Sequence, residues 1–127
     1  MDTSALVSFD IENGREVIEA LDRDGKNPNV ALWAKLPDYE DWRLVIASDQ
    51  LDKDTLLSGY EEINAAMKKA GIAYRKRPTI YWRPMEKPFI QALRKTFATA
   101  SDTYGMRLGG QMFGDQYIED AFVYRIR

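Results

Sequence analysis

Two pairs of β-rich runs, separated by helix-like stretches, constrain the fold of this chain more than any other feature of its sequence. The first pair is residues 30–36 and 42–48, and the five polar residues between them predict a hairpin loop. The second pair is residues 106–112 and 118–126, which again predicts a hairpin. Strands joined by short loops run antiparallel, so we expect a mostly antiparallel sheet.

Helix signals lie before, between and after these runs. Apolar residues recur at helical spacing over residues 10–23, and Asp24-Gly25 is expected to end that helix. Ser58 and Glu61 stand at capping-box spacing at the start of a second helix, which Gly71 is expected to end. Pro88 favours the first turn of a third helix over residues 88–100.

These elements follow one another in the order α-ββ-α-β-α-ββ. The order predicts an α+β fold with a mostly antiparallel five-stranded sheet packed by three helices. A chain of 127 residues, 45% of them apolar, fits one domain over residues 1–127. Alternation places Leu32 with Leu44 on one face of the sheet and Trp33 with Val45 on the other, so we expect both faces to be partly covered.

The chain contains no histidine and no cysteine, and this composition excludes several reactions. Ser-His-Asp catalysis, cysteine nucleophiles, disulfides and histidine or thiolate zinc sites cannot be built from it. The alternative is a carboxylate or magnesium site, but polar turns select acidic residues for backbone reasons alone. We therefore expect no catalytic residue, no metal and no cofactor. The two acidic clusters are Asp38, Glu40 and Asp41, and Asp115, Glu119 and Asp120.

The hydropathy of the chain indicates its location. No stretch approaches the roughly 18 consecutive apolar residues that a membrane span needs. Asp2 stands where a signal peptide has a basic region. We therefore expect a cytoplasmic protein with no membrane partner.

The charge is unevenly distributed along the chain, although the net charge is only −2. Residues 1–64 carry 15 acidic and six basic side chains, a net −9, whereas residues 65–127 carry 12 basic and five acidic ones, a net +7. Such a polarised chain pairs its halves internally, pairs them between copies, or presents a face that attracts anions.

The segment Arg75-Lys-Arg-Pro-Thr-Ile-Tyr-Trp-Arg-Pro84 is the most informative stretch of the basic half. If residues 75–83 were one strand, its arginines and Tyr81 would form a basic and aromatic stripe suited to phosphates and bases. The same composition is typical of an edge strand, which proline and cations protect from pairing with other chains. Both interpretations stay open. The candidate binding residues are Arg75, Arg77, Tyr81, Arg83, Lys68, Lys69 and Arg94.

Three segments carry a resemblance to known sequences: Val30-Ala-Leu-Trp33, Glu40-Asp-Trp-Arg-Leu-Val-Ile-Ala-Ser48 and Tyr117-Ile-Glu-Asp-Ala-Phe-Val-Tyr-Arg125. They resemble an uncharacterised family of small bacterial proteins with no established function. The resemblance implies a bacterial single-domain protein and assigns no site residues.

We expect a non-catalytic interaction domain that binds an unknown protein partner, or a second copy of itself as a homo-oligomer, through its acidic and basic regions. The alternative is nucleic-acid binding through the stripe at residues 75–83. A carboxylate or magnesium enzyme is the least favoured function.

Overall fold

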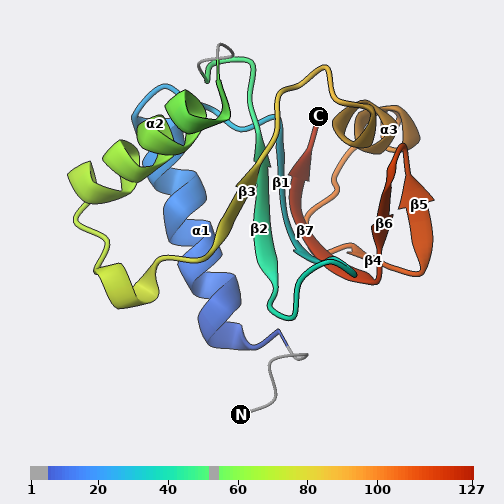
Figure 1. The fold of residues 1–127 in the computed structure, drawn as a ribbon, viewed down its shortest axis with the longest axis horizontal. Coiled ribbons are helices and arrows are strands. Elements are labelled where there is room, and N and C mark those ends of the chain that lie inside the picture. The colour runs from blue at the N-terminus through green and yellow to red at the C-terminus, as the bar shows by residue number, and fades with distance from the viewer. Residues whose placement is uncertain (1–5, 52–54) are drawn as a thin grey trace.

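The computed structural model describes residues 6–51 and 55–127 and has an α+β fold (Figure 1). A five-stranded sheet has the strand order β3-β2-β1-β7-β4, and a separate two-stranded hairpin consists of β5 and β6. Only β2 and β3 are parallel; the other neighbouring strands are antiparallel. The predicted fold class is therefore confirmed. The elements are α1 (Ser8–Arg23), β1 (Val30–Lys35), β2 (Arg43–Ala47), α2 (Leu56–Lys69), the 3₁₀ turn η1 (Tyr74–Lys76), β3 (Ile80–Trp82), α3 (Pro88–Thr96), β4 (Arg107–Leu108), β5 (Gln111–Phe113), β6 (Gln116–Ile118) and β7 (Asp120–Ile126).

Both faces of the sheet are covered, as the apolar residues on both sides of its strands predict. Helices α1 and α2 lie on one face, while α3 and the β5–β6 hairpin lie on the other (Figure 1). Trp33 and Trp82 are buried under α1 and α2. Leu32 and Val45 are buried under α3 and the hairpin. Two apolar cores thus share one sheet.

The predicted pairing of the first two strands is wrong by one residue. Leu32 pairs with Val45 and Trp33 pairs with Leu44, so the expected face partners are exchanged. The connection between β1 and β2 covers residues 36–42, two residues more than the predicted loop. A one-residue change of register moves every side chain of a strand to the opposite face.

Helix α2 sits close to the sheet because Gly59 has no side chain. A β-carbon at position 59 would collide with the indole ring of Trp82 in β3. The indole Nε1 of Trp82 donates a hydrogen bond of 2.7 Å to the carbonyl of Leu56 in the first turn of α2. Thr55 begins the helix, since its hydroxyl accepts a hydrogen bond from the Ser58 amide at 3.0 Å. The cap is thus three residues before the predicted one.

The second predicted hairpin forms, but its two arms are divided between two sheets. The short strands β5 and β6 meet at a turn with Gly114 at φ 62°, and they pack as their own sheet beside α3. Nearer the ends of the predicted hairpin, β4 pairs with β7, which lies in the main sheet between β1 and β4. No helix among the described residues is long and apolar enough to cross a membrane.

Candidate interaction surface

The seven residues predicted to bind a ligand do not form one surface. Lys68 and Lys69 are exposed in the last turn of α2, on one side of the sheet. Arg94 is in α3, on the other side (Figure 1). The remaining four lie around η1 and β3, between these two helices in the sequence: Arg75, Arg77, Tyr81 and Arg83.

The predicted continuous strand over residues 75–83 is wrong. Residues 74–76 form the 3₁₀ turn η1, and only residues 80–82 pair with β2. The side chain of Arg77 turns back, because its Nε donates a hydrogen bond of 3.0 Å to the carbonyl of Ile72. Arg75 is exposed and lies in a different element from Arg83. The period-two stripe that would align three arginines with Tyr81 therefore does not exist.

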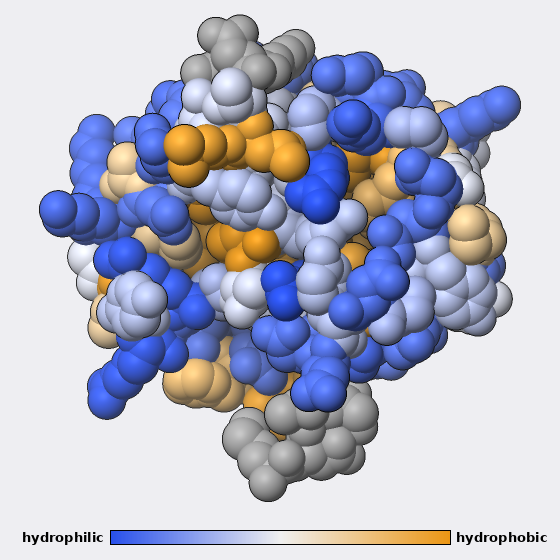
Figure 2. Space-filling model, in the orientation of Figure 1, coloured by the Kyte–Doolittle hydropathy of each residue, from blue (hydrophilic) through white to orange (hydrophobic). Residues whose placement is uncertain are grey.

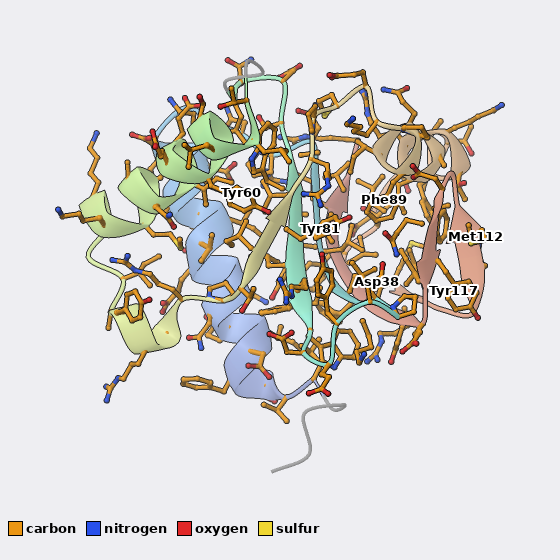
Figure 3. All side chains as sticks on the ribbon, viewed as in Figure 1. Asp38, Tyr60, Tyr81, Phe89, Met112 and Tyr117 are labelled. Carbon is orange, nitrogen blue, oxygen red and sulfur yellow. The ribbon has the colours of Figure 1, made fainter. Side chains whose placement is uncertain are left out.

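The ring of Tyr81 is enclosed by other side chains (Figure 3). Tyr39 and Phe89 contact it edge to face, with ring centroids 6.1 and 6.5 Å away. The guanidinium carbon of Arg83 lies 3.8 Å from its centroid. Burial raises the pKa of Tyr81, which keeps the phenol neutral. Only 9% of the residue is exposed, so the ring has little free area for stacking a base.

β3 is an edge strand, as one of the two interpretations predicts, and its outer edge is partly closed. The amide of Arg83 bonds to Ile46 in β2, so the main-chain groups of Trp82 point away from the sheet. The Trp82 amide donates to the hydroxyl of Tyr60 at 3.4 Å, and the Trp82 carbonyl accepts from Arg83 Nη1 at 2.7 Å. Side chains thus use groups that another strand would otherwise bind.

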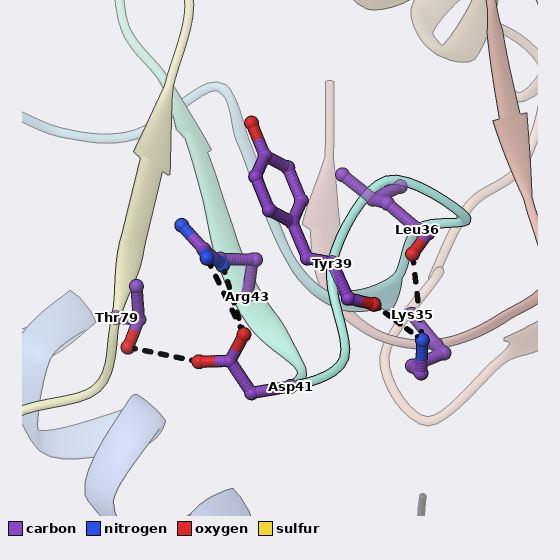
Figure 4. A network of polar contacts seen from close by, with 6 residues as sticks. All are labelled: Lys35, Leu36, Tyr39, Asp41, Arg43 and Thr79. Carbon is purple, nitrogen blue, oxygen red and sulfur yellow. Dashed lines mark hydrogen bonds and ion pairs between the residues drawn. The ribbon is translucent and has the colours of Figure 1, made fainter.

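Salt bridges and hydrogen bonds hold one acid of the first acidic cluster. The carboxylate of Asp41 lies 3.3 Å from Arg43 and accepts a hydrogen bond from the Thr79 hydroxyl at 3.5 Å (Figure 4). The guanidinium carbon of Arg43 also lies 3.8 Å from the ring centroid of Tyr39. Lys35 donates to the Tyr39 carbonyl at 2.6 Å. These contacts fix the β1–β2 loop against β3.

The second acidic cluster is divided between two basic residues. Glu119 lies 3.7 Å from Lys35, and Asp120 lies 2.7 Å from Arg107. Within residues 6–51 and 55–127, no three acidic side chains come together in a way that would hold a metal ion. Glu119 and Asp120 thus stabilise the local structure through their ion pairs.

A groove beside α3 combines cations with apolar side chains and has no acidic side chain among its described lining residues. It has a volume of about 590 Å³ and lies between the end of α3, residues 97–100 and the end of β7. Figure 2 shows mostly hydrophilic side chains on the face toward the viewer, with apolar ones in small separate areas. We call this groove the α3 groove. Its cations are Arg94, Lys95 and Arg127, and its apolar side chains are Phe97, Ala98 and Ile126.

The described side chains that line the α3 groove include cations and no acidic group. Arg94 is held in place, since its Nε donates a hydrogen bond of 2.9 Å to the Arg127 carbonyl. A second hollow, of about 210 Å³, lies between β3 and the β5–β6 turn. Asp115 lines that hollow together with Arg83 and Lys87 and offsets part of their charge.

Sequence reasoning found only Arg94 of the α3 groove. Lys95 is adjacent to it and could have been found from the two cations in the last helical turn. Phe97 could not, because its helical spacing indicates a core residue. Ile126 and Arg127 join the groove only because β7 ends beside α3.

Comparison with family models, with curated proteins and with solved structures gave no match. The resemblance to a bacterial family therefore stays a prediction.

Proposed function

We propose that the protein is a non-catalytic interaction domain that binds an acidic segment of a protein partner in the α3 groove. The observation that carries this proposal is the combination of three cations with an apolar floor and no lining acid among the described residues. Protein interfaces commonly have an apolar centre surrounded by polar and charged groups. The α3 groove has both parts.

The two kinds of side chain have different roles in such binding. The half-buried Phe97 and the exposed Ala98 offer apolar area, which supplies most of the affinity when it is buried. Lys95 and Arg94 select for acidic partners and accelerate their approach. The bond from Arg94 to the Arg127 carbonyl reduces the side-chain entropy that binding would otherwise remove.

Nucleic-acid binding has less support from the arrangement of the charges. The basic residues lie on both sides of the sheet, and Tyr81 has little exposed ring area. A carboxylate enzyme has less support too, because Asp41 and Asp120 are held by arginines. Binding of a protein partner in the α3 groove does not require Tyr81, Asp41 or Asp120 to be free.

An NMR titration tests the proposal. The probe is an acidic amphipathic helical peptide that contains glutamates and one phenylalanine, and the control peptide has glutamine in place of each glutamate. We expect the acidic probe to shift the amide signals of residues 94–97 and 126–127, with a Kd that rises with salt because screening weakens charge attraction. Equal binding of both peptides would contradict the proposal.

A charge-reversed pair of variants locates the binding. Arg94→Glu with Lys95→Glu should weaken binding of the acidic peptide at least about tenfold, which corresponds to about 1.4 kcal/mol. The matched control is Lys68→Glu with Arg75→Glu, which changes the net charge equally at exposed positions outside the groove. The control should change the Kd less than about twofold. If both pairs weaken binding equally, the attraction is general and the α3 groove is not the site.

A further inference from the structure

We infer that the acidic segment that fits the α3 groove is helix α1 of a second copy of this chain. This inference rests on the proposed function and names its partner. The chain itself presents an exposed acidic helix face with an aromatic side chain, which is the chemistry that the groove would recognise.

The outer face of α1 combines negative charge with an exposed aromatic ring. The residues Phe9, Glu12, Glu16 and Glu19 follow at spacings of three, four and three, so they form one row along the helix. Phe9 is 59% exposed. Glu12 and Glu19 form no ion pair within residues 6–51 and 55–127, whereas Glu16 lies 3.5 Å from Lys76. We call this row the α1 row.

The α1 row and the α3 groove are complementary in charge. The row carries three carboxylates, and the groove carries three cations without an acid among its described lining residues. They are also complementary in apolar content. Phe9 would bury its ring against Phe97 and Ala98, while Glu12, about 4.5 Å further along the helix axis, would approach Arg94 or Lys95.

The fold prevents one chain from making this contact with itself. Helix α1 packs on one face of the sheet and α3 packs on the other (Figure 1). Each copy therefore offers a row at one place and a groove at another. A contact of this kind is head to tail: it closes into a pair or ring when the rotation between copies permits it, and otherwise continues into a chain.

The test uses two complementary variants of the full chain. The first, Phe9→Ser with Glu12→Gln, has an altered row and an intact groove. The second, Arg94→Glu with Lys95→Glu, has an altered groove and an intact row. Light scattering and sedimentation velocity measure the mass of each variant, of the wild type and of an equimolar mixture.

We expect the wild-type mass to rise with protein concentration and to fall toward the monomer as salt increases. Each variant alone should stay monomeric. The mixture should form a one-to-one dimer and nothing larger, because only the row of the second variant and the groove of the first remain compatible. A control chain with Lys68→Glu and Lys87→Glu, two exposed positions away from the α1 row and the α3 groove, should associate like the wild type.

Two outcomes overturn the inference. A wild type that stays monomeric at low salt and high concentration excludes the second copy as the occupant. Association that persists unchanged in both variants places the contact elsewhere. If the acidic peptide binds in the groove while the wild type is monomeric, the proposed function stands and another acidic protein is the partner. If the acidic peptide does not bind and the chains do not associate, both proposals fail.

Discussion

The hydroxyl of Tyr124 occupies the space that a β-carbon on Gly14 would need. The Tyr124 hydroxyl donates to the carbonyl of Ile11 in α1 and accepts a hydrogen bond of 3.0 Å from Trp33 Nε1. Trp33 Nε1 also lies 3.1 Å from the Asp10 carbonyl. A strand near the end of the chain thereby fixes the first helix through a polar contact in the core.

Gly14→Ala should destabilise the fold, although alanine is the better helix former by about 1 kcal/mol. The added methyl group would displace Tyr124 and stretch its bonds to α1, and overpacking of this kind costs about 1–3 kcal/mol. Urea denaturation measures the change in the free energy of unfolding. Glu19→Ala, at an exposed position on the same helix, should change it by less than about 0.5 kcal/mol. Equal effects of the two substitutions on the free energy of unfolding would show that Gly14 and Tyr124 are not tightly packed.

Gly59→Ala should separate the start of α2 from the edge strand. The new methyl group would meet the indole of Trp82 and disturb its bond to Leu56. We expect a loss of about 1–3 kcal/mol in unfolding free energy together with a change in tryptophan fluorescence. Asn64→Ala on the exposed side of α2 is the control and should leave the fluorescence unchanged. An unaltered spectrum for Gly59→Ala would contradict the expected contact.

Alkaline pH should destabilise the folded chain through Tyr124. Burial raises the pKa of Tyr124, so its phenol stays protonated in the folded chain at a pH where the unfolded chain ionises. The stability from this group is complete below about pH 10 and is lost as the pH rises above that value. Denaturation curves between about pH 9 and about pH 11 measure the decline.

Tyr124→Phe separates this effect from the ionisation of other groups. At neutral pH the variant should be less stable by about 1–2 kcal/mol, because the Ile11 carbonyl loses its donor. Its stability should then fall less steeply above about pH 10, since Tyr81 still contributes but Tyr124 does not. Parallel declines in the two proteins would rule out Tyr124 as a source of the pH dependence.

Arg83→Ala should promote aggregation. The substitution removes the donor to the Trp82 carbonyl and the cation above Tyr81, which leaves an exposed strand edge. Turbidity at constant temperature should rise faster than for the wild type, and stability should fall by about 1–2 kcal/mol. Arg75→Ala removes the same charge from an exposed side chain and should behave like the wild type. Similar turbidity for the two variants would indicate a general charge effect.

Single-stranded nucleic acid should bind weakly, if at all. Because Arg75, Arg77 and Arg83 do not share a strand face, we expect a Kd no tighter than about 10⁻⁴ M at about 50 mM salt in a fluorescence-anisotropy titration. Replacing all three by alanine should not change the salt dependence. Tight binding whose log-log salt slope falls by about 0.7 for each arginine removed would restore the nucleic-acid alternative.

The sequence by itself determined where the three α-helices and the first two strands lie. Helical spacing and Pro88 located α1, α2 and α3 to within a few residues, because hydrophobic period and helix-start residues are properties of neighbouring residues. The alternation of β1 and β2 likewise indicated a sheet with two apolar faces. The absence of histidine and cysteine excluded whole classes of chemistry without any structure.

The tertiary structure decided register, edges and surfaces. Whether Leu32 faces Leu44 or Val45 depends on a one-residue difference in pairing, which side-chain packing across the sheet selects. The 3₁₀ turn at residues 74–76 divided the basic segment, and Tyr39 and Phe89 cover Tyr81, which would otherwise be exposed. The α3 groove joins Arg94 to Ile126 and Arg127, more than 30 residues away in the chain. Only the packing of α3 against the end of β7 brings them together. A local sequence pattern does not reveal a contact between residues so far apart in the chain.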